Sequence, residues 1–417
     1  MQKIFALQSI EIMSPVGSYE SLMAALQGGA GSVYFGVGKL NMRSRSSANF
    51  TLDDLKKIAS LCNKKGVKTY ITLNTIIFDN ELDEMHHIVD AAKENGITAI
   101  IASDLSVLEY ARQQGVEVHI STQCNITNTE AVKFYSQYAD VMVTARELNL
   151  EQVAAIIKNI KEQNICGPSG KQVRIEIFCH GALCMAISGK CYLSLDNFHA
   201  SANRGACLQP CRRSYVLTDK EEGYQIEVDH DYLMSPKDLK TIGFLDKILH
   251  AGVSVLKIEG RGRSADYVKT VTRCYREAVD AYFSGEFTSE HIARWDEQLK
   301  TVYNRDFWDG YYLGRKMGEW TEQYGSQATQ TKVYVGKINN YFSKLHVAEI
   351  KIETQTLNVG DEYKIIGSTT GVLEGIVEEI RLEDKCIATA GKGDVISMPV
   401  PGTVRRADKL YKIISNF

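Results

Sequence analysis

The cysteines of this 417-residue chain are unevenly distributed, and five of the ten lie between positions 179 and 211. Clustered cysteines in an intracellular protein, as we expect this one to be, are more often metal ligands than disulfide partners. Four of them, Cys184, Cys191, Cys207 and Cys211, are separated by seven, sixteen and four positions. Thiolates bind both zinc and iron–sulfur clusters, so this segment is a candidate metal site.

The spacing of these four cysteines bears on which metal they would bind. Structural zinc sites usually contain cysteine pairs with two to four residues between them, and only Cys207 and Cys211 are spaced in that way. An iron–sulfur cluster takes four thiolates at irregular spacing. We therefore predict an iron–sulfur cluster on this set, with a single zinc ion or a group of buried structural thiols as the alternatives.

A second group of candidates consists of polar and charged side chains that follow short apolar runs. They are Arg43, Asn74, Gln123, Asn125, Arg146, His180, Glu259 and Arg261. Each alone could cap a helix or satisfy a structural hydrogen bond, and His180 could equally be a packing group beside the cysteines. Guanidinium groups pair in a two-pronged way with carboxylate or phosphate, so the three arginines favour an anionic ligand.

The elements that would position these residues alternate between strand and helix patterns. Runs typical of strands occupy residues 12–13, 32–37, 69–74, 99–102, 117–121, 140–144, 174–178 and 254–258. Eight such units over about 280 residues predict an α/β fold, a (β/α)8 barrel of the triosephosphate isomerase type. A doubly wound sheet would carry G-x-G-x-x-G after its first strand, where this chain has SPVGSYE. In the barrel, the polar residues would converge at the carboxyl ends of the strands.

Three parts are predicted along the chain. Residues 1–285 would form the barrel, with the cysteines in an insert, 180–236, that is too long for an ordinary βα loop. Residues 286–330 would be a linking helical segment, and 331–417 read as a small β-barrel, a possible RNA-docking module. We expect the helix before the eighth strand to begin near Lys237, a turn at Asn339–Asn340 and a final strand at GTVRR.

Composition and charge are those of an ordinary globular protein. Hydrophobic residues make up 44%, charged residues 24%, and the net charge is −3. The chain is therefore not a strongly basic nucleic-acid coat, although a local basic patch could still bind phosphate. No stretch approaches the length of a membrane span, and the first residues lack a cleavage site. We expect a cytoplasmic protein without membrane contact.

At EIFCHGALCMAISGKCYLS the chain resembles the collagenase-like peptidase superfamily. Shorter segments extend the resemblance along the whole chain, among them SPVGS, NMRSR, TLNT, STQCNITN, NRGACLQPCR and KIEGR. The superfamily is named for proteolysis, but its better understood members are oxygen-independent hydroxylation proteins with a 4Fe–4S cluster. The branch that converts the wobble uridine of tRNA to 5-hydroxyuridine, using prephenate, is the most similar, because its four cluster cysteines match Cys184, Cys191, Cys207 and Cys211.

The resemblance implies a tRNA-hydroxylating enzyme with a 4Fe–4S cluster and prephenate as co-substrate. We predict a catalytic group made of Asn74, Gln123, His180 and Glu259, and a substrate-binding group made of Arg43, Asn125, Arg146 and Arg261. Three alternatives stay open. They are hydroxylation of ribosomal RNA, a peptidase that is active without iron, and a non-enzymatic RNA-binding protein with structural zinc.

Overall fold

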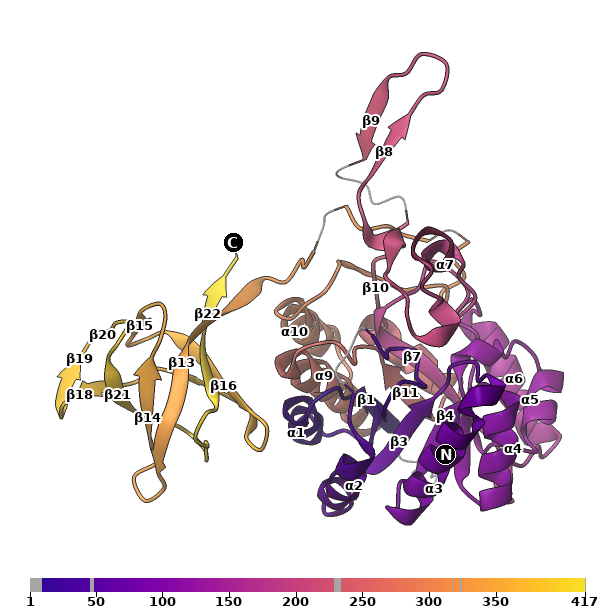
Figure 1. The fold of residues 1–417 in the computed structure, drawn as a ribbon, viewed down its shortest axis with the longest axis horizontal. Coiled ribbons are helices and arrows are strands. Elements are labelled where there is room, and N and C mark those ends of the chain that lie inside the picture. The colour runs from indigo at the N-terminus through magenta and orange to yellow at the C-terminus, as the bar shows by residue number, and fades with distance from the viewer. Residues whose placement is uncertain (1–9, 46–48, 229–233, 317, 323–324, 417) are drawn as a thin grey trace.

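Eight parallel strands close into a barrel in the computed structural model, which describes residues 10–45, 49–228, 234–316, 318–322 and 325–416. The strands are β1 (Glu11–Pro15), β2 (Ser32–Gly36), β3 (Lys68–Leu73), β4 (Ala99–Ala102), β5 (Glu117–Ile120), β6 (Val141–Val143), β7 (Arg174–Ala182) and β11 (Val255–Ile258). Each pairs with the next, and β11 pairs with both β7 and β1, which closes the ring. The predicted (β/α)8 barrel is confirmed (Figure 1).

Helices cover the outside of this barrel, as the spacing of apolar residues predicted. They are α1 (Tyr19–Gln27), α2 (Leu55–Asn63), α3 (Leu82–Glu94), α4 (Leu105–Gln114), α5 (Thr129–Tyr135), α6 (Leu150–Glu162), α8 (Leu245–His250) and α9 (Ala265–Ser284). Side-chain caps fix several of their starts: Ser18 accepts from the Ser21 amide, and Asn149 accepts from the Gln152 amide. Such caps satisfy backbone donors that a helix leaves unpaired in its first turn.

The segment before β11 differs from the prediction. No helix begins near Lys237; a short strand, β10 (Asp238–Lys240), runs antiparallel to the end of β7 and is followed by a 3-10 turn, Ile242–Phe244, and then α8. The cause is the length of β7. This strand continues to Ala182, beyond the predicted end at Phe178, and its extension offers backbone groups that β10 pairs with.

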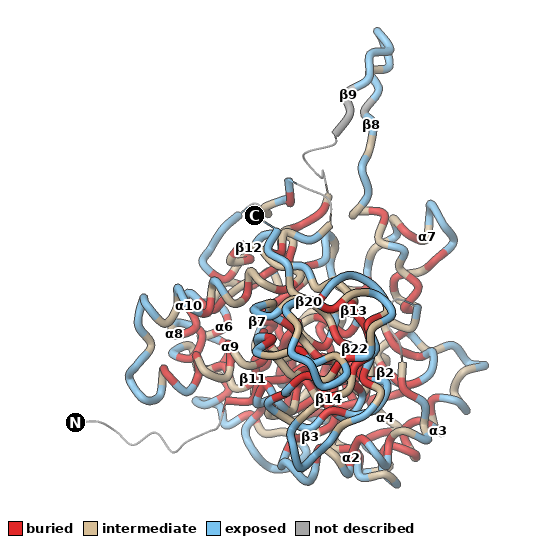
Figure 2. The backbone as a smooth tube through the Cα atoms, turned by 90° about the vertical axis from the view of Figure 1, so that its left-hand side faces the viewer, coloured by how far each residue is buried: buried red, intermediate tan, exposed pale blue. Residues whose placement is uncertain are grey.

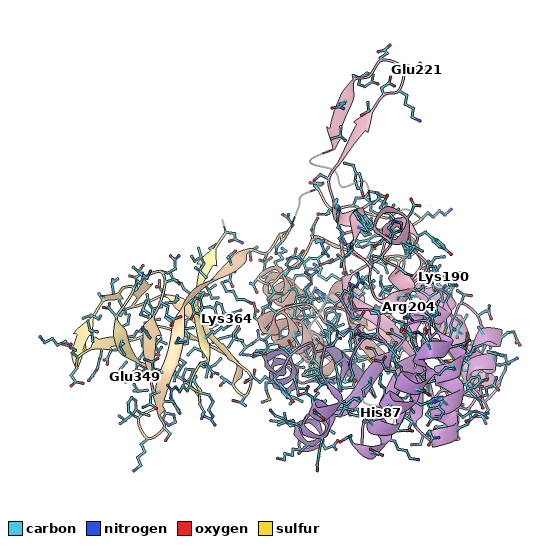
Figure 3. The ribbon with its side chains drawn as sticks, viewed as in Figure 1. His87, Lys190, Arg204, Glu221, Glu349 and Lys364 are labelled. Atoms are coloured by element: carbon cyan, nitrogen blue, oxygen red, sulfur yellow. The ribbon has the colours of Figure 1, made fainter. Side chains whose placement is uncertain are left out.

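In the part of the cysteine-bearing insert that the structure describes, only short elements lie above the carboxyl ends of the barrel strands. They are α7 (Leu193–Phe198), two 3-10 turns (Ala202–Arg204 and Pro210–Arg212) and the hairpin of β8 (Tyr215–Thr218) and β9 (Gln225–Val228). The hairpin projects away from the barrel, and its outer part is exposed (Figures 1 and 2). Glu221 lies at its far end (Figure 3).

The C-terminal region is an antiparallel sheet with an apolar core of its own. After α10 (Ser289–Lys300) and β12 (Phe307–Trp308), the sheet contains β13 (Gln330–Phe342), β14 (Val347–Ile352), β16 (Glu362–Gly367), β17 (Gly371–Ile376), β18 (Ile380–Leu382), β19 (Lys385–Ile387), β21 (Val395–Pro399) and β22 (Lys409–Ser415), and β15 (Leu357–Asn358) pairs separately with β20 (Thr389–Ala390). Gln27 of α1 bonds the backbone of Thr370 and Val372, and Lys269 of α9 bonds Glu374.

Two details of this region were predicted wrongly. Residues 402–406, GTVRR, form no strand, and the last strand is β22. The predicted turn at Asn339–Asn340 lies inside β13, where the pairing with β14 shifts register between Ile338 and Asn340. A bulge of this kind absorbs residues that favour turns without ending the strand.

Candidate active site at the carboxyl end of the barrel

A cavity of about 340 Å³ opens at the carboxyl ends of the barrel strands and is roofed by the insert. Ten of the twelve residues predicted for the site border it: Arg43, Asn74, Gln123, Arg146, Glu259, Arg261, Cys184, Cys191, Cys207 and Cys211 are among its lining residues. Asn125 and His180 are not. The topology brings the four cysteines and the polar residues of the strand ends together. Parallel strands of the barrel all end on one face, and the chain after β7 folds back over that face.

The four cysteines border one cavity from three separate stretches of the insert. Cys184 is exposed, and Cys191, Cys207 and Cys211 are partly buried. Burial raises the pKa of Cys211 to about 11, Arg212 opposes this rise, and the thiols of the other three cysteines add to it. A bound cation would reverse that balance, because thiolates are favoured beside positive charge. In the described parts of the chain, no three His, Cys, Asp or Glu side chains lie close enough together to hold a single metal ion.

Backbone contacts fix the loop between the second and third of these cysteines. Gly205 has φ +69, and a Cβ there would lie 2.1 Å from the carbonyl oxygen of Asn41. Only glycine allows this approach, which places the insert directly on the loop after β2. Arg204, labelled in Figure 3, pairs with Glu81 from the 3-10 turn Asp79–Glu81 that directly precedes α3. Beyond the turn, the amide of Gln209 donates to Cys207 Sγ at 3.4 Å.

Glu259 and Arg43 form an ion pair in the wall of the cavity. Arg43 Nη2 donates to Glu259 Oε1 at 2.6 Å, and the Glu259 side chain is 14% exposed. Burial alone would raise the pKa of this carboxyl group, but Arg43, Arg146 and Arg261 together lower it to about 2. Glu259 therefore holds a negative charge that organises the arginines around it.

Arg261 lies in the floor of the site, where it is 5% exposed. Its Nη1 donates to Thr72 Oγ1 at 2.8 Å and to Asn41 Oδ1 at 3.1 Å. Burial lowers the pKa of Arg261 to about 10, although Tyr34 and Glu259 oppose the shift. Gly36, the last residue of β2, makes room for the guanidinium, because a Cβ there would lie 2.5 Å from Nη1.

Arg146 has the least satisfied guanidinium of the three predicted arginines. It stacks on the ring of Phe178 at 4.0 Å, and its buried Nε has no hydrogen-bond partner among the described atoms. Arg146 also borders a second cavity of about 240 Å³, in which Asn125 lies. An arginine whose Nε has no hydrogen-bond partner, and which stacks on an aromatic ring and borders two cavities, is suited to an anionic ligand.

The amides of Asn74 and Gln123 lie side by side on neighbouring loops. Gln123 Nε2 donates to the carbonyl oxygen of Asn74 at 2.8 Å, and Ser121 donates to Gln123 Oε1. Asn74 Oδ1 accepts from the Met42 amide at 3.2 Å. The pair thus joins the carboxyl ends of β3 and β5 to the loop that carries Arg43.

A model of peptidase family U32 matches residues 17–322. The chain belongs to peptidase family U32. It is 58% identical to a protein named collagenase from Porphyromonas gingivalis, over 97% of this chain and 98% of the relative. It is 32% identical to the tRNA hydroxylation protein P1 of Bacillus subtilis, over 90% and 87%. It is also 36% identical to the 23S rRNA 5-hydroxycytidine C2501 synthase of Escherichia coli, over 65% of this chain and 39% of that one.

The family assignment agrees with the predicted collagenase-like resemblance and with an enzyme of either peptidase-like or RNA hydroxylase-like type. It does not choose between these activities, because relatives of both kinds cover most of the barrel. None of the described helices is long and apolar enough to cross a membrane.

His180 of this U32 protein is placed differently from the other predicted residues. It is 1% exposed, and its ring packs between those of Tyr275 at 5.6 Å and Phe307 at 5.5 Å. Burial lowers its pKa to about 3, with Lys240 and Arg263 adding to the effect. A neutral ring in such surroundings supports the fold of β7 and does not border the cavity.

Several cavity residues were missing from the predicted set. Tyr34, Lys257, Arg212, Arg263 and Arg305 all border the cavity. A sequence signal existed for Lys257, because it lies on the predicted eighth strand two residues before Glu259, which directly follows the end of β11, and side chains two apart in an extended segment share a face. The signal for Arg212 was its position directly after Cys211, but its contacts with the carbonyl oxygens of Leu183 and Pro236 join distant parts of the insert.

Proposed function

We propose that this U32 protein hydroxylates a uridine of tRNA, the wobble uridine, and that Cys184, Cys191, Cys207 and Cys211 hold a 4Fe–4S cluster for this reaction. The observation that carries the proposal is the shared cavity. Four thiols and a group of arginines border it together, and relatives named for tRNA hydroxylation align with most of the chain.

The donor set supports a cluster more than a single zinc ion. Four thiols are the usual ligands of a 4Fe–4S cluster. A zinc ion would need thiolates about 2.3 Å from one centre, and no described group of three ligands is that compact. A cluster is wider than one ion, so thiols spread around a cavity suit it better. When bound, it would supply electron transfer or Lewis-acid chemistry.

Arginine side chains beside the cysteines would offset the negative charge of a bound cluster. Arg43 and Arg212 act electrostatically on Cys184, so both would stabilise its thiolate. The Cys207 sulfur already accepts a backbone hydrogen bond, a contact that tunes sulfur ligands of iron. These features make the pocket suitable for a negatively charged thiolate cluster.

The arginines would bind the anionic co-substrate, for which prephenate, with two carboxylates, is our proposal. Arg146 is the first choice, because its Nε is buried without a partner. Arg43 donates to Glu259, and Arg261 donates to Thr72 and Asn41. Because both guanidinium groups already have protein partners, they would position the anion site and contribute less to direct contact with the ligand. The adjacent amides of Asn74 and Gln123 carry both donors and acceptors, as recognition of a uracil edge requires.

Mass spectrometry of tRNA nucleosides tests this proposal. Cells that lack the gene should lose 5-hydroxyuridine and its derivatives, and the wild-type gene should restore them. A gene with Cys191→Ser and Cys207→Ser should not. Unchanged tRNA in a strain without any second U32 protein would overturn the proposal, and loss of a hydroxylated ribosomal cytidine in its place would shift the substrate to ribosomal RNA.

A peptidase is the second candidate, because the 58% identical relative carries the name collagenase. A Ser-His-Asp arrangement would need a histidine beside its nucleophile. Neither histidine nor aspartate is among the residues that border the main cavity in the described structure. Cleavage of gelatin by iron-free protein, abolished by one substitution in this cavity, would establish this candidate over the first.

A further inference from the structure

An ion pair lies inside the barrel, below the site described above. Lys257 of β11 borders the cavity and is 5% exposed, and its Nζ lies 2.8 Å from Oε1 of Glu176 on β7, which is fully buried. The rings of Tyr34 and Phe178 lie 4.8 and 5.5 Å from the same Nζ. Barrels of this type are normally filled by bulky apolar side chains. A buried ion pair inside the barrel is therefore unusual and suggests a function.

The second oxygen of Glu176 points away from Lys257 toward a histidine. Glu176 Oε2 lies 4.0 Å from Nδ1 of His119 on β5, which is also fully buried. Both atoms lack a hydrogen-bond partner in the described structure. A buried polar atom without a partner costs about 1–3 kcal/mol. These two face each other, and a proton between them, with a small approach, would satisfy both.

The other side of the histidine leads to solvent. His119 Nε2 lies 3.2 Å from Oε1 of Glu117, whose side chain is 36% exposed at the amino-terminal end of β5. The Tyr70 ring lies 4.4 Å from the His119 ring, and its hydroxyl donates to Glu11, which Lys68 and Arg174 also contact. A continuous series of ionisable groups therefore joins the cavity to the opposite end of the barrel.

We propose that His119 and Glu176 relay protons through the barrel to Lys257, which delivers them to the substrate bound in the cavity. In one cycle the Lys257 ammonium gives a proton to the reacting atom and becomes a neutral amine. His119 Nδ1 gives its proton to the Glu176 carboxylate at Oε2, and the carboxyl group rotates and passes that proton to Lys257 Nζ, which restores the ammonium and the carboxylate. His119 Nε2 then takes a proton from solvent beside Glu117, and a turn of the ring presents a protonated nitrogen to Glu176 again. One proton enters for each one delivered, only N–H and O–H bonds change, and no electrons are transferred.

The inference deepens the proposed function, because hydroxylation of a base requires protons to be exchanged at the cavity. Lys257 would be the residue that meets the substrate, and Glu176 and His119 would act through it. The competing explanation is a purely structural ion pair. Buried pairs are weak evidence for stability, and a structural pair would not require the unpaired contact on its far side.

The first test measures coupling along the series and does not depend on activity. Protein labelled with ¹⁵N in its nine histidines is studied by NMR, and His119→Gln identifies the His119 signals by their loss. In Lys257→Met, Glu176 loses its cationic partner, and its Oε2 should then accept a hydrogen bond from a protonated Nδ1 of His119, so the Nδ1 signal should move toward that of a protonated ring nitrogen. Lys269→Met is the control, because Lys269 also pairs with a glutamate at 2.9 Å but lies on α9; it should leave the signal unchanged. An identical His119 signal in Lys257→Met and wild type would overturn the relay.

The second test measures hydroxylation of tRNA by the purified holoenzyme. Glu176→Gln keeps the shape of the side chain but cannot pass a proton, so the rate should be lower by about 100-fold or more, the usual contribution of a proton-transfer group. His119→Ala should be similarly slow and should regain activity with free imidazole, a response that a structural role would not give. A wild-type rate in Glu176→Gln, or no effect of imidazole on His119→Ala, would overturn the relay.

The two tests separate the relay from the proposed function. If the wild-type holoenzyme hydroxylates no RNA, the proposed function is wrong, and the NMR measurement alone then decides whether protons are shared between the cavity and His119.

Discussion

The Glu259 carboxylate provides a quantitative test of the charge arrangement in the cavity. Its pKa is about 2, compared with an ordinary value of 4.5. At about 1.4 kcal/mol for each tenfold change in an equilibrium constant, this difference corresponds to about 3 kcal/mol of stability at neutral pH. The pKa is lower in the folded protein, so the contribution is present above pH 4.5 and is lost as the pH decreases from there toward 2.

Glu259→Gln should therefore lower the free energy of unfolding by about 3 kcal/mol at pH 7, which agrees with the usual cost of breaking a buried ion pair. Urea unfolding of wild type and variant at a series of pH values measures the difference. This difference in the free energy of unfolding should shrink as the pH decreases from 4.5 toward 2, the interval between the pKa of Glu259 in the unfolded chain and its pKa in the folded protein. Glu109→Gln removes an exposed partner of Arg112 and should show a much smaller pH-dependent difference, because solvent screens an exposed ion pair.

A stability difference that stayed constant across that pH range would refute this reasoning. It would mean that the carboxylate charge is not what holds Arg43, and that the effect of the substitution comes from packing alone. A higher free energy of unfolding in Glu259→Gln than in wild type would also refute the reasoning. It would mean that the carboxylate does not offset the repulsion among the three arginines around it.

Three further predictions concern the packing around Arg261, the iron content of the protein and the binding of the anionic co-substrate. Gly36→Ala places a Cβ against the Arg261 guanidinium and should destabilise the protein by about 1–3 kcal/mol in thermal unfolding, whereas Gly243→Ala, which meets nothing within 4 Å, should not. Cys191→Ser should reduce the iron content of anaerobically purified protein and bleach its colour, whereas Cys386→Ser, in the C-terminal sheet, should leave both unchanged; equal iron in the two variants would contradict the ligand assignment. Arg146→Met should weaken prephenate binding in calorimetry by about 10-fold to 100-fold, the loss of one charge-assisted hydrogen bond, and unchanged affinity would remove Arg146 from the anion site.

The barrel could be predicted from the sequence because its signals are local. Strand-like runs and helix-stopping glycines such as Gly115, which is in the left-handed conformation at the end of α4, depend on neighbours in the chain. The insert could not be predicted in the same way. Its conformation depends on contacts between distant residues, such as Arg204 with Glu81 and Gly205 with Asn41, and no periodic pattern records them.

His180 shows where alternation along a strand stops being a guide. Glu176 and Phe178 point into the barrel, and strict alternation would place His180 there too. The pairing of β7 with β11 shifts register between Lys257 and Ile258, opposite this part of β7. The irregularity accompanies a change in direction of the His180 side chain, which packs against Tyr275. A one-residue shift of this kind is invisible in the sequence, because it depends on how two strands meet.

Arg43 connects the two halves of the site, the barrel strands and the cysteine-bearing insert. It contacts Glu259 from the barrel at 2.6 Å and also interacts electrostatically with Cys184 from the insert. Glu259 is the main anionic partner of this guanidinium. If Cys184 became a thiolate ligand, the two anions would share Arg43, and its hold on Glu259 would weaken. Binding of a cluster to the four cysteines would then change the charge balance between Glu259 and its arginines through the Arg43 side chain alone, without any movement of the barrel. The family relationship alone does not predict such coupling, because function depends on the site and not on the fold that carries it.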